Sequence, residues 1–350
     1  MAPLDGDQLS RQAYHNGERA YAGGMSGASP PGGEFAIGND EQYRPVQAVG
    51  DQRVLVSGPE GTGLLACHAS RPLAGPYRAP VVVVVHGALR DSGRYLASAQ
   101  HAARLAGADP LIVAPQFLAD VDRVDGALCW PVEGWKGGYP ALRPAALSSF
   151  TAMDSLLGQL APEPGPEPAV VVFGNSAGGQ FVHRYAAVGR GPDALAARGL
   201  PVRFVVANPS TYLYFDRERP VDVPDGAHVN DWRYGFDRAP GYVDADPDDP
   251  DGPRRSLERY LGRDVTIVLG ELDNDGASLL LEVSPAAMAQ GANRLDRGLR
   301  YDQHVRGLAR AAGLPFPHRL IRLASVGHAA ADVLAAPRTR EIVFGGQVRA

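Results

Sequence analysis

Stretches of consecutive apolar residues recur along this chain, and the fold can be predicted from their pattern. Val81–Val85 and Ala169–Phe173 contain only apolar residues, and Leu111–Pro115, Val202–Ala207 and Asp264–Gly270 are nearly as apolar. Runs without polar alternation are typical of strands that are buried on both faces, as in a parallel sheet. The pattern therefore predicts an α/β fold with a mostly parallel sheet.

Helical patterns fall between these runs, as a parallel sheet requires, because its strands need crossover connections. The expected helices are Tyr95–Ala106, 145–160, one starting at Gln180, and Leu295–Ala312 with Gly313 as its C-cap. Two further strand-like runs, Val54–Val56 and Leu64–His68, flank a glycine-rich turn and predict a hairpin before the sheet. Arg319–Leu323 is the last expected strand.

Three segments lack any such pattern. Residues 1–45 are polar and rich in Gly, Pro and Ser, so we expect a flexible arm that precedes one domain over 46–350. Residues 116–143 predict a pocket loop, and residues 209–260 predict an inserted, aromatic-rich cap or lid. The expected substrate pocket takes residues from both segments and from the end of the first buried strand: Leu89, Trp130, Trp135, Tyr212 and Trp232. A satellite core sealed by these rings is the open alternative.

Composition narrows the function classes. The net charge of −5 over 350 residues and the absence of a basic stripe argue against a nucleic-acid or membrane partner. Cys67 and Cys129 lie outside any metal-binding spacing, so we expect free thiols, a reducing compartment and no metal bound by these residues. The first residues show no leader pattern, which favours a cytoplasmic location. The oligomeric state is left open.

The chemistry centres on Gly174-Asn175-Ser176-Ala177-Gly178, which follows one apolar run and precedes a helical pattern. G-x-S-x-G between a strand and a helix is the nucleophile elbow, in which the serine sits on a sharp turn with its hydroxyl above the sheet. Such a turn crowds the residues two before and two after the serine, so glycine is favoured there. An ordinary Gly/Ser-rich loop is the alternative.

An elbow serine needs an acid and a histidine, in the chain order Ser, Asp or Glu, His. Asp273 follows the strand that ends at Gly270, and His328 follows Leu323. Both lie beyond the carboxyl ends of strands, where functional loops of parallel sheets meet. The sequence leaves Asp275, Glu271 and Asp216 open as alternative acids, and His86, His183 and His318 as competing histidines.

An acyl-transfer site also needs an oxyanion hole. The backbone N–H of Ala177, directly after the serine, is the first expected donor. The second comes from the loop after an earlier strand, where His86-Gly87-Ala88 stands, so we expect Ala88, with Leu89 as the other choice.

With these motifs the chain resembles the α/β-hydrolase superfamily over roughly residues 50–340, and its serine motif and aromatic insert resemble the esterase and polyester-depolymerase-like branches. The resemblance implies a mostly parallel eight-stranded sheet with helices on both faces and an inserted cap. Fold kinship alone does not fix the reaction.

The expected function is a serine hydrolase that cleaves a carboxylic ester or thioester of a small, partly apolar molecule through an acyl-serine intermediate. Ser176, Asp273 and His328 would form the triad. An acyltransferase or cyclase could use the same triad with an acceptor other than water, and a non-catalytic binding scaffold is the third hypothesis.

Overall fold

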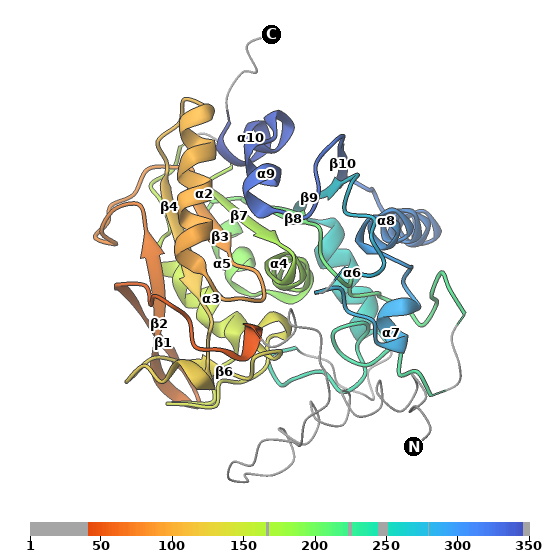
Figure 1. The fold of residues 1–350 in the computed structure, drawn as a ribbon, viewed down its shortest axis with the longest axis horizontal. Coiled ribbons are helices and arrows are strands. Elements are labelled where there is room, and N and C mark those ends of the chain that lie inside the picture. The colour runs from red at the N-terminus through yellow and green to blue at the C-terminus, as the bar shows by residue number, and fades with distance from the viewer. Residues whose placement is uncertain (1–40, 166–167, 223–225, 244–250, 279, 346–350) are drawn as a thin grey trace.

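The centre of the computed structural model, which describes residues 41–165, 168–222, 226–243, 251–278 and 280–345, is an eight-stranded sheet (Figure 1). Its strand order is β1-β2-β4-β3-β7-β8-β9-β10. The strands are β1 (Gln52–Gly58), β2 (Gly61–Ala69), β3 (Val81–Val85), β4 (Leu111–Gln116), β7 (Val170–Asn175), β8 (Val202–Ala207), β9 (Asp264–Gly270) and β10 (Arg319–Leu323). From β4 to β10 all neighbours pair parallel, whereas β1–β2 and β2–β4 pair antiparallel. The predicted hairpin and parallel sheet are confirmed.

The unbroken apolar runs arise because this sheet is covered on both faces. Along β3, Val81, Val83 and Val85 belong to one hydrophobic core, and the alternate residues Val82 and Val84 belong to a second core across the sheet. Successive side chains of a strand point to opposite faces, so both sets must be apolar when both faces are buried.

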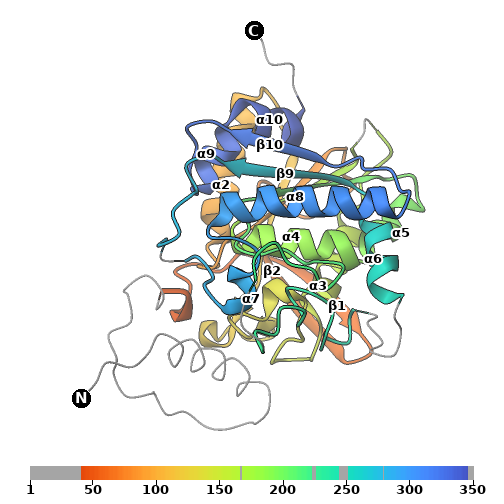
Figure 2. The ribbon, with the colours of Figure 1, turned by 90° about the vertical axis from the view of Figure 1, so that its right-hand side faces the viewer.

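Helices form the two covering layers. One face packs against α2 (Ser92–Leu105), α9 (Ala330–Ala335) and α10 (Pro337–Phe344). The opposite face, turned to the viewer in Figure 2, packs against α3 (Ser149–Gln159), α4 (Ala177–Val188), α5 (Gly191–Ala196), α6 (Gly252–Leu261) and α8 (Arg294–Ala311). Short elements complete the described chain: η1 (Glu41–Tyr43), β5 (Leu118–Ala119), η2 (Asp120–Asp122), β6 (Cys129–Trp130), η3 (Trp135–Gly137) and α7 (Pro285–Met288).

Polar caps set the helix starts. The Asp91 side chain accepts the N–H of Arg94, so α2 begins three residues before the apolar pattern predicted. Ser148 caps α3 through the N–H of Phe150, and α3 therefore starts later than the expected 145. Apolar periodicity reports the buried face of a helix, whereas its first residue depends on the cap.

The two loop segments are built onto the main core. Residues 116–143 contain the small β5–β6 sheet, which the sequence did not predict, and α6 lies at the end of the predicted cap. Aromatic residues of the described part of 209–260 join the same core as the sheet: Tyr212, Tyr214, Phe215, Trp232, Phe236 and Tyr242. Most of the predicted arm, residues 1–40, and parts of the predicted cap lie outside the described residues.

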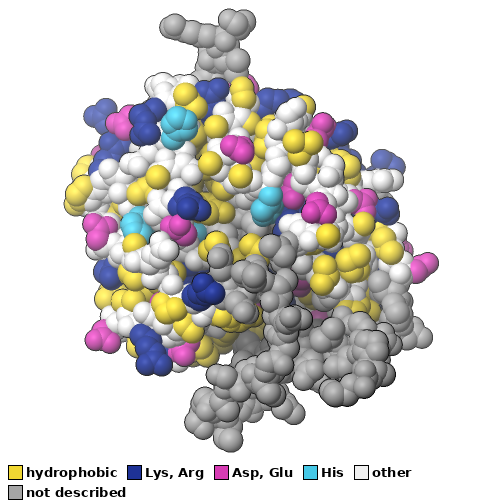
Figure 3. All heavy atoms as spheres, viewed as in Figure 1, with side chains coloured by type: hydrophobic (Ala, Val, Ile, Leu, Met, Phe, Trp, Pro, Cys, Tyr) yellow, Lys and Arg dark blue, Asp and Glu magenta, His cyan; other side chains and the backbone are white. Residues whose placement is uncertain are grey.

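Charge is distributed without a dominant sign on the face shown in Figure 3, where acidic and basic side chains are interspersed. Within the described ranges, no helix combines the length and the apolar character that a membrane span needs.

One packing contact gives a stability prediction. A Cβ at Gly178, in the first turn of α4, would overlap the carbonyl oxygens of Val85 and His86. Gly178→Ala should therefore lower the free energy of unfolding by about 1 to 3 kcal/mol, as overpacked cores do. The matched control is Gly158→Ala, on an exposed helical position with open space, which should raise stability by about 0.5 to 1 kcal/mol. Equal urea midpoints for both variants would contradict this.

Candidate active site

Ser176 sits in a strained turn between β7 and α4. Its backbone has φ 61° and ψ −123°, a region that residues with a side chain rarely adopt. A Cβ at Gly174 would overlap the carbonyl of Gly178, so the turn closes only because neither residue has a side chain. The serine is mostly covered, with 7% of its surface exposed. This is the geometry of a nucleophile elbow.

Asp273 and His328 form a direct pair. His328 Nδ1 lies 2.7 Å from Asp273 Oδ2, and the carboxylate is buried while the imidazole is partly open to solvent. A carboxylate at Nδ1 holds the proton on that nitrogen and leaves Nε2 free to accept another. The pair can therefore orient a general base.

Two asparagines hold this pair at the elbow. The Asn175 side chain, next to Ser176, donates to the carbonyl of His328 at 3.0 Å. Asn208, after β8 and at φ 43°, accepts the N–H of Gly270 at 2.9 Å and donates to the carbonyl of Gly327. The loops after β7, β8, β9 and β10 are thus tied together at the carboxyl edge of the sheet.

The competing histidines have structural roles. His86 Nδ1 lies 2.8 Å from the carbonyl of Gly87, and its Nε2 accepts the N–H of Phe117, which accounts for both ring nitrogens of a neutral imidazole. Complete burial lowers the pKa of His86 to about 4. Burial likewise lowers the pKa of His183 to about 3 and that of His318 to about 4. Their ring nitrogens contact Leu213, Tyr260 and the carbonyl of Tyr260.

The alternative acids are engaged elsewhere. Asp216 Oδ1 lies 3.0 Å from His304 Nε2, Glu271 pairs with Arg322, and Asp275 accepts the N–H of Ala277. Of the four candidate acids, the geometry thus brings Asp273 to His328.

Among the residues that the structure describes, one side-chain group has ligand atoms suited to a metal ion. Single ligand atoms of Asp216, Glu218 and His304 all lie within 4.8 Å of one another. The Asp216–His304 hydrogen bond already accounts for their closest contact.

The expected oxyanion loop lies beside the serine. A Cβ on Gly87 would come within 4.0 Å of Ser176 Cβ, and the N–H of Arg90 closes a turn on the carbonyl of Gly87, with Ala88 and Leu89 between them. The buried Arg90 guanidinium pairs with the buried Asp122 carboxylate through two contacts of 3.1 and 3.2 Å, which fixes the end of this turn. Ala177 is the first residue of α4, so its N–H has no intrahelical acceptor.

The four predicted aromatic pocket residues lie in the core instead. Trp130 donates to the carbonyl of Leu147, and Trp232 donates to the carbonyl of Gly137. Trp135 and Tyr212 are equally buried, so none of these rings exposes a wall to substrate. They join the main hydrophobic core rather than the satellite core that was the open alternative, because loop segments of this length must bury their aromatic surface against the domain. Leu89, 39% exposed in the turn beside Ser176, stays a pocket candidate.

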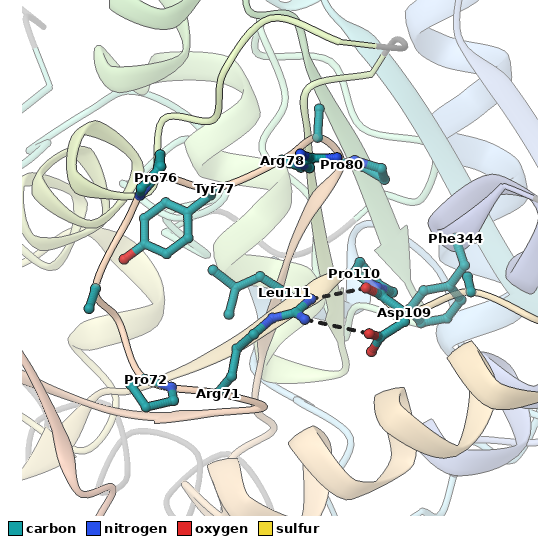
Figure 4. A pocket seen from close by; sticks show the side chains of 13 residues that line it. Arg71, Pro72, Pro76, Tyr77, Arg78, Pro80, Asp109, Pro110, Leu111 and Phe344 are labelled. Atoms are coloured by element: carbon teal, nitrogen blue, oxygen red, sulfur yellow. Dashed lines mark hydrogen bonds and ion pairs between the residues drawn. The ribbon is translucent and has the colours of Figure 1, made fainter.

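A hollow of about 480 Å³ lies at the amino edge of the sheet, and Figure 4 shows the side chains that line it. It is lined by Pro80 and Leu111, at the amino ends of β3 and β4, and by an ion pair between Arg71 and Asp109. Its lining contains no serine or histidine, so this hollow is separate from the elbow.

Comparison with solved structures identifies the fold. The chain is similar to a poly(3-hydroxybutyrate) depolymerase, LpqC, from Bordetella parapertussis, with 26% identity over 82% of this chain and 86% of that one, at a TM-score of 0.58. It is also similar to poly(aspartic acid) hydrolase-1 from Sphingomonas sp. KT-1, with 22% identity over 86% and 99% of the two chains and the same TM-score. The chain has the α/β-hydrolase fold.

The likeness to these α/β-hydrolases supports a hydrolase of this type. No family model and no curated protein matches the sequence.

Three residues of this α/β-hydrolase site were missed by sequence reasoning. Asn208 contacts the loop of His328, and Arg294 contacts Asp273. The Tyr95 hydroxyl lies against Gly87 and forms a hydrogen bond with the side chain of Asn175. Asn208 had one local signal, because asparagine follows the β8 run directly and tolerates a positive φ. Tyr95 and Arg294 had none, because each reaches the site from a helix.

The acid can be tested by a matched pair. Asp273→Asn should lower the rate of ester turnover by about 10⁴, because an amide stabilises the wrong imidazole tautomer. Asp216→Asn removes a carboxylate from a different histidine and should keep the rate within about threefold. Initial rates with p-nitrophenyl esters measure both, and a larger loss in Asp216→Asn would transfer the acid's role to that residue.

Proposed function

We propose that this protein is a serine hydrolase that cleaves a carboxylic ester or thioester through an acyl-serine intermediate. The observation that carries the proposal is the Asp273–His328 pair, 2.7 Å apart, tied by Asn175 to the strained turn of Ser176. The loops of these three residues lie at the carboxyl edge of the sheet, which supports their proposed roles as nucleophile, base and orienting carboxylate.

The residues divide the reaction between them. His328 Nε2 accepts the proton of Ser176 as the hydroxyl oxygen bonds to the substrate carbonyl carbon. The same proton passes to the leaving group as the ester bond breaks, which leaves the acyl group on Ser176. Water then attacks the acyl-serine and gives a proton to His328, and that proton returns to the Ser176 oxygen as the acyl–serine bond breaks and the acid leaves. Asp273 stabilises the imidazolium at each proton transfer.

The negative oxygen of each tetrahedral intermediate needs two N–H donors. We assign them to Ala177 and Ala88. The position of Ala177 at the start of α4 and the Gly87–Arg90 turn beside Ser176 support this assignment. Leu89 is the alternative second donor and, by its exposure, the proposed contact for an apolar part of the substrate.

The substrate proposed from the sequence is a small, partly apolar ester or thioester, bound without metal or cofactor. One structural neighbour is a poly(3-hydroxybutyrate) depolymerase, so a short polymer of hydroxyacid esters is the competing substrate class. With a small-molecule substrate, the proposed location is the cytoplasm. Product mass separates hydrolysis, which adds water, from acyl transfer or cyclisation by the same triad.

Labelling with a fluorophosphonate tests the proposal directly. Intact mass should show a single adduct on the wild-type protein, and Ser176→Ala should show none while keeping its thermal midpoint. Turnover of p-nitrophenyl esters should fall by about 10⁴ or more in Ser176→Ala and by a similar factor in His328→Ala, because triad members act as a unit.

The control is Ser98→Ala, a serine on the surface of α2 whose hydroxyl contacts only its own helix at Arg94. It should keep both the adduct and the rate. Folded wild-type protein that gains no adduct, or an adduct that survives in Ser176→Ala, would refute an activated Ser176.

A further inference from the structure

Arg294 shares the carboxylate of Asp273 with His328. Asp273 Oδ2 contacts His328 Nδ1 at 2.7 Å, and Oδ1 lies 3.3 Å from Arg294 Nη1. Each oxygen of the carboxylate thus has its own cationic or cation-forming partner. Both Asp273 and Arg294 are buried, with exposed fractions of 5% and 0%.

The guanidinium is fixed from several sides. Arg294 Nε donates to Ser210 Oγ at 3.1 Å, after β8, and Nη1 also donates to Ser278 Oγ at 3.1 Å. Arg294 is the first residue of α8, and the N–H of the next residue, Leu295, donates to the carbonyl of Asp273 at 3.2 Å. Side chain and backbone therefore tie the start of α8 to the loop of the acid.

Such a buried cation needs the carboxylate, and the carboxylate needs the cation. An isolated buried charge is costly, whereas a paired and hydrogen-bonded one is tolerated. Burial lowers the pKa of Arg294, and the charge of Asp273 acts in the opposite direction. An arginine keeps its proton at any assay pH, so its charge is a constant element of the site.

We propose that Arg294 is a positioning residue for the acid, which holds the Asp273 carboxylate with Oδ2 turned to His328 and places a fixed positive charge beside the pair. The inference rests on the proposed function, because it assigns Arg294 a role in the Ser176–His328–Asp273 triad. Nothing in a purely structural role would couple Arg294 to the pH at which His328 becomes a base.

The charges determine the direction in which the pH dependence of activity moves when Arg294 is removed. Removing Arg294 removes a positive charge near His328, which favours the imidazolium, and deprives buried Asp273 of a cation, which favours its protonated form. Both effects require a higher pH before the site holds a neutral His328 and an ionised Asp273. The rise of activity with pH should therefore move upward in the variant.

Other charged groups around the pair are unchanged in the Arg294 variants. Asp275 acts on Arg294 by its charge, Arg297 lies one turn along α8, and the buried Tyr212 phenol feels the charge of Asp273. Glu271 is paired with Arg322 at 2.8 Å. None of them replaces the direct contact that Arg294 makes with Oδ1.

The test is the second-order rate of fluorophosphonate labelling of Ser176, measured between about pH 5 and pH 9, which requires no knowledge of the substrate. Arg294→Met should move the midpoint of the rise up by about one pH unit. Arg294→Gln, which keeps a hydrogen-bond donor without the charge, should move it in the same direction. Arg294→Lys should restore a midpoint within about 0.3 units of the wild type, because it restores the charge.

Arg297→Met is the matched control. Arg297 is a second buried arginine of α8, whose guanidinium contacts the carbonyls of Gly291 and Ser210 rather than a carboxylate. Its loss should reduce the thermal midpoint with little change in the pH of the rise.

The outcomes separate the two proposals. Wild-type protein without labelling would reject the serine hydrolase itself. Labelling whose midpoint is unchanged in folded Arg294→Met and Arg294→Gln would reject only the role of Arg294. If neither variant folds, Arg294→Lys decides: a folded Arg294→Lys whose midpoint differs from the wild type by more than about 0.3 units would reject a role that depends on the positive charge.

Discussion

The structure depends on how closely α4 approaches the strands beneath it. Gly178 lies against the carbonyls at the end of β3, and Gly174 against the carbonyl of Gly178. Any side chain at either position would push the helix off the sheet and open the turn at Ser176. The strain of that residue, φ 61°, is tolerated because packing on both sides over-determines it. The same approach puts the amino end of the helix beside the loop that begins at His86.

Buried arginines tie α4 to the segments around it. Arg184, inside α4, donates to the carbonyls of Lys136 and Arg233 and to Thr211 Oγ1, which joins the two loop segments to one helix. Arg263 donates to the carbonyls of Tyr185, Ala186 and Gly189 at the other end of α4. A cation there satisfies unpaired carbonyls and complements the helix dipole. Guanidinium groups suit this role because their five N–H donors lie in one plane and point in different directions, so that one side chain can reach several acceptors.

Sequence reasoning succeeded where the physical signal is local. Unbroken apolar runs gave the parallel strands, and Asp273 and His328 could be proposed because loops after parallel strands meet at one edge. It failed for the aromatic residues of the loops, since a tryptophan in a segment without periodicity looks the same whether it lines a pocket or fills a core. Trp232 is settled by its contact with Gly137, almost a hundred positions away along the chain. Contacts of that kind have no local pattern, and Arg294 was missed for the same reason.

The histidines show how burial assigns roles that residue type cannot. Four of them could serve as a base by chemistry, yet His86, His183 and His318 are enclosed, and desolvation lowers their pKa values far below neutrality. The ring nitrogens of each make hydrogen bonds to backbone groups or to the Tyr260 hydroxyl. His328 differs in being partly open to solvent and paired with a carboxylate, which can stabilise the charge that it must acquire. A base needs both properties at once, because burial without a counter-charge prevents protonation and exposure without a carboxylate leaves the tautomer unfixed.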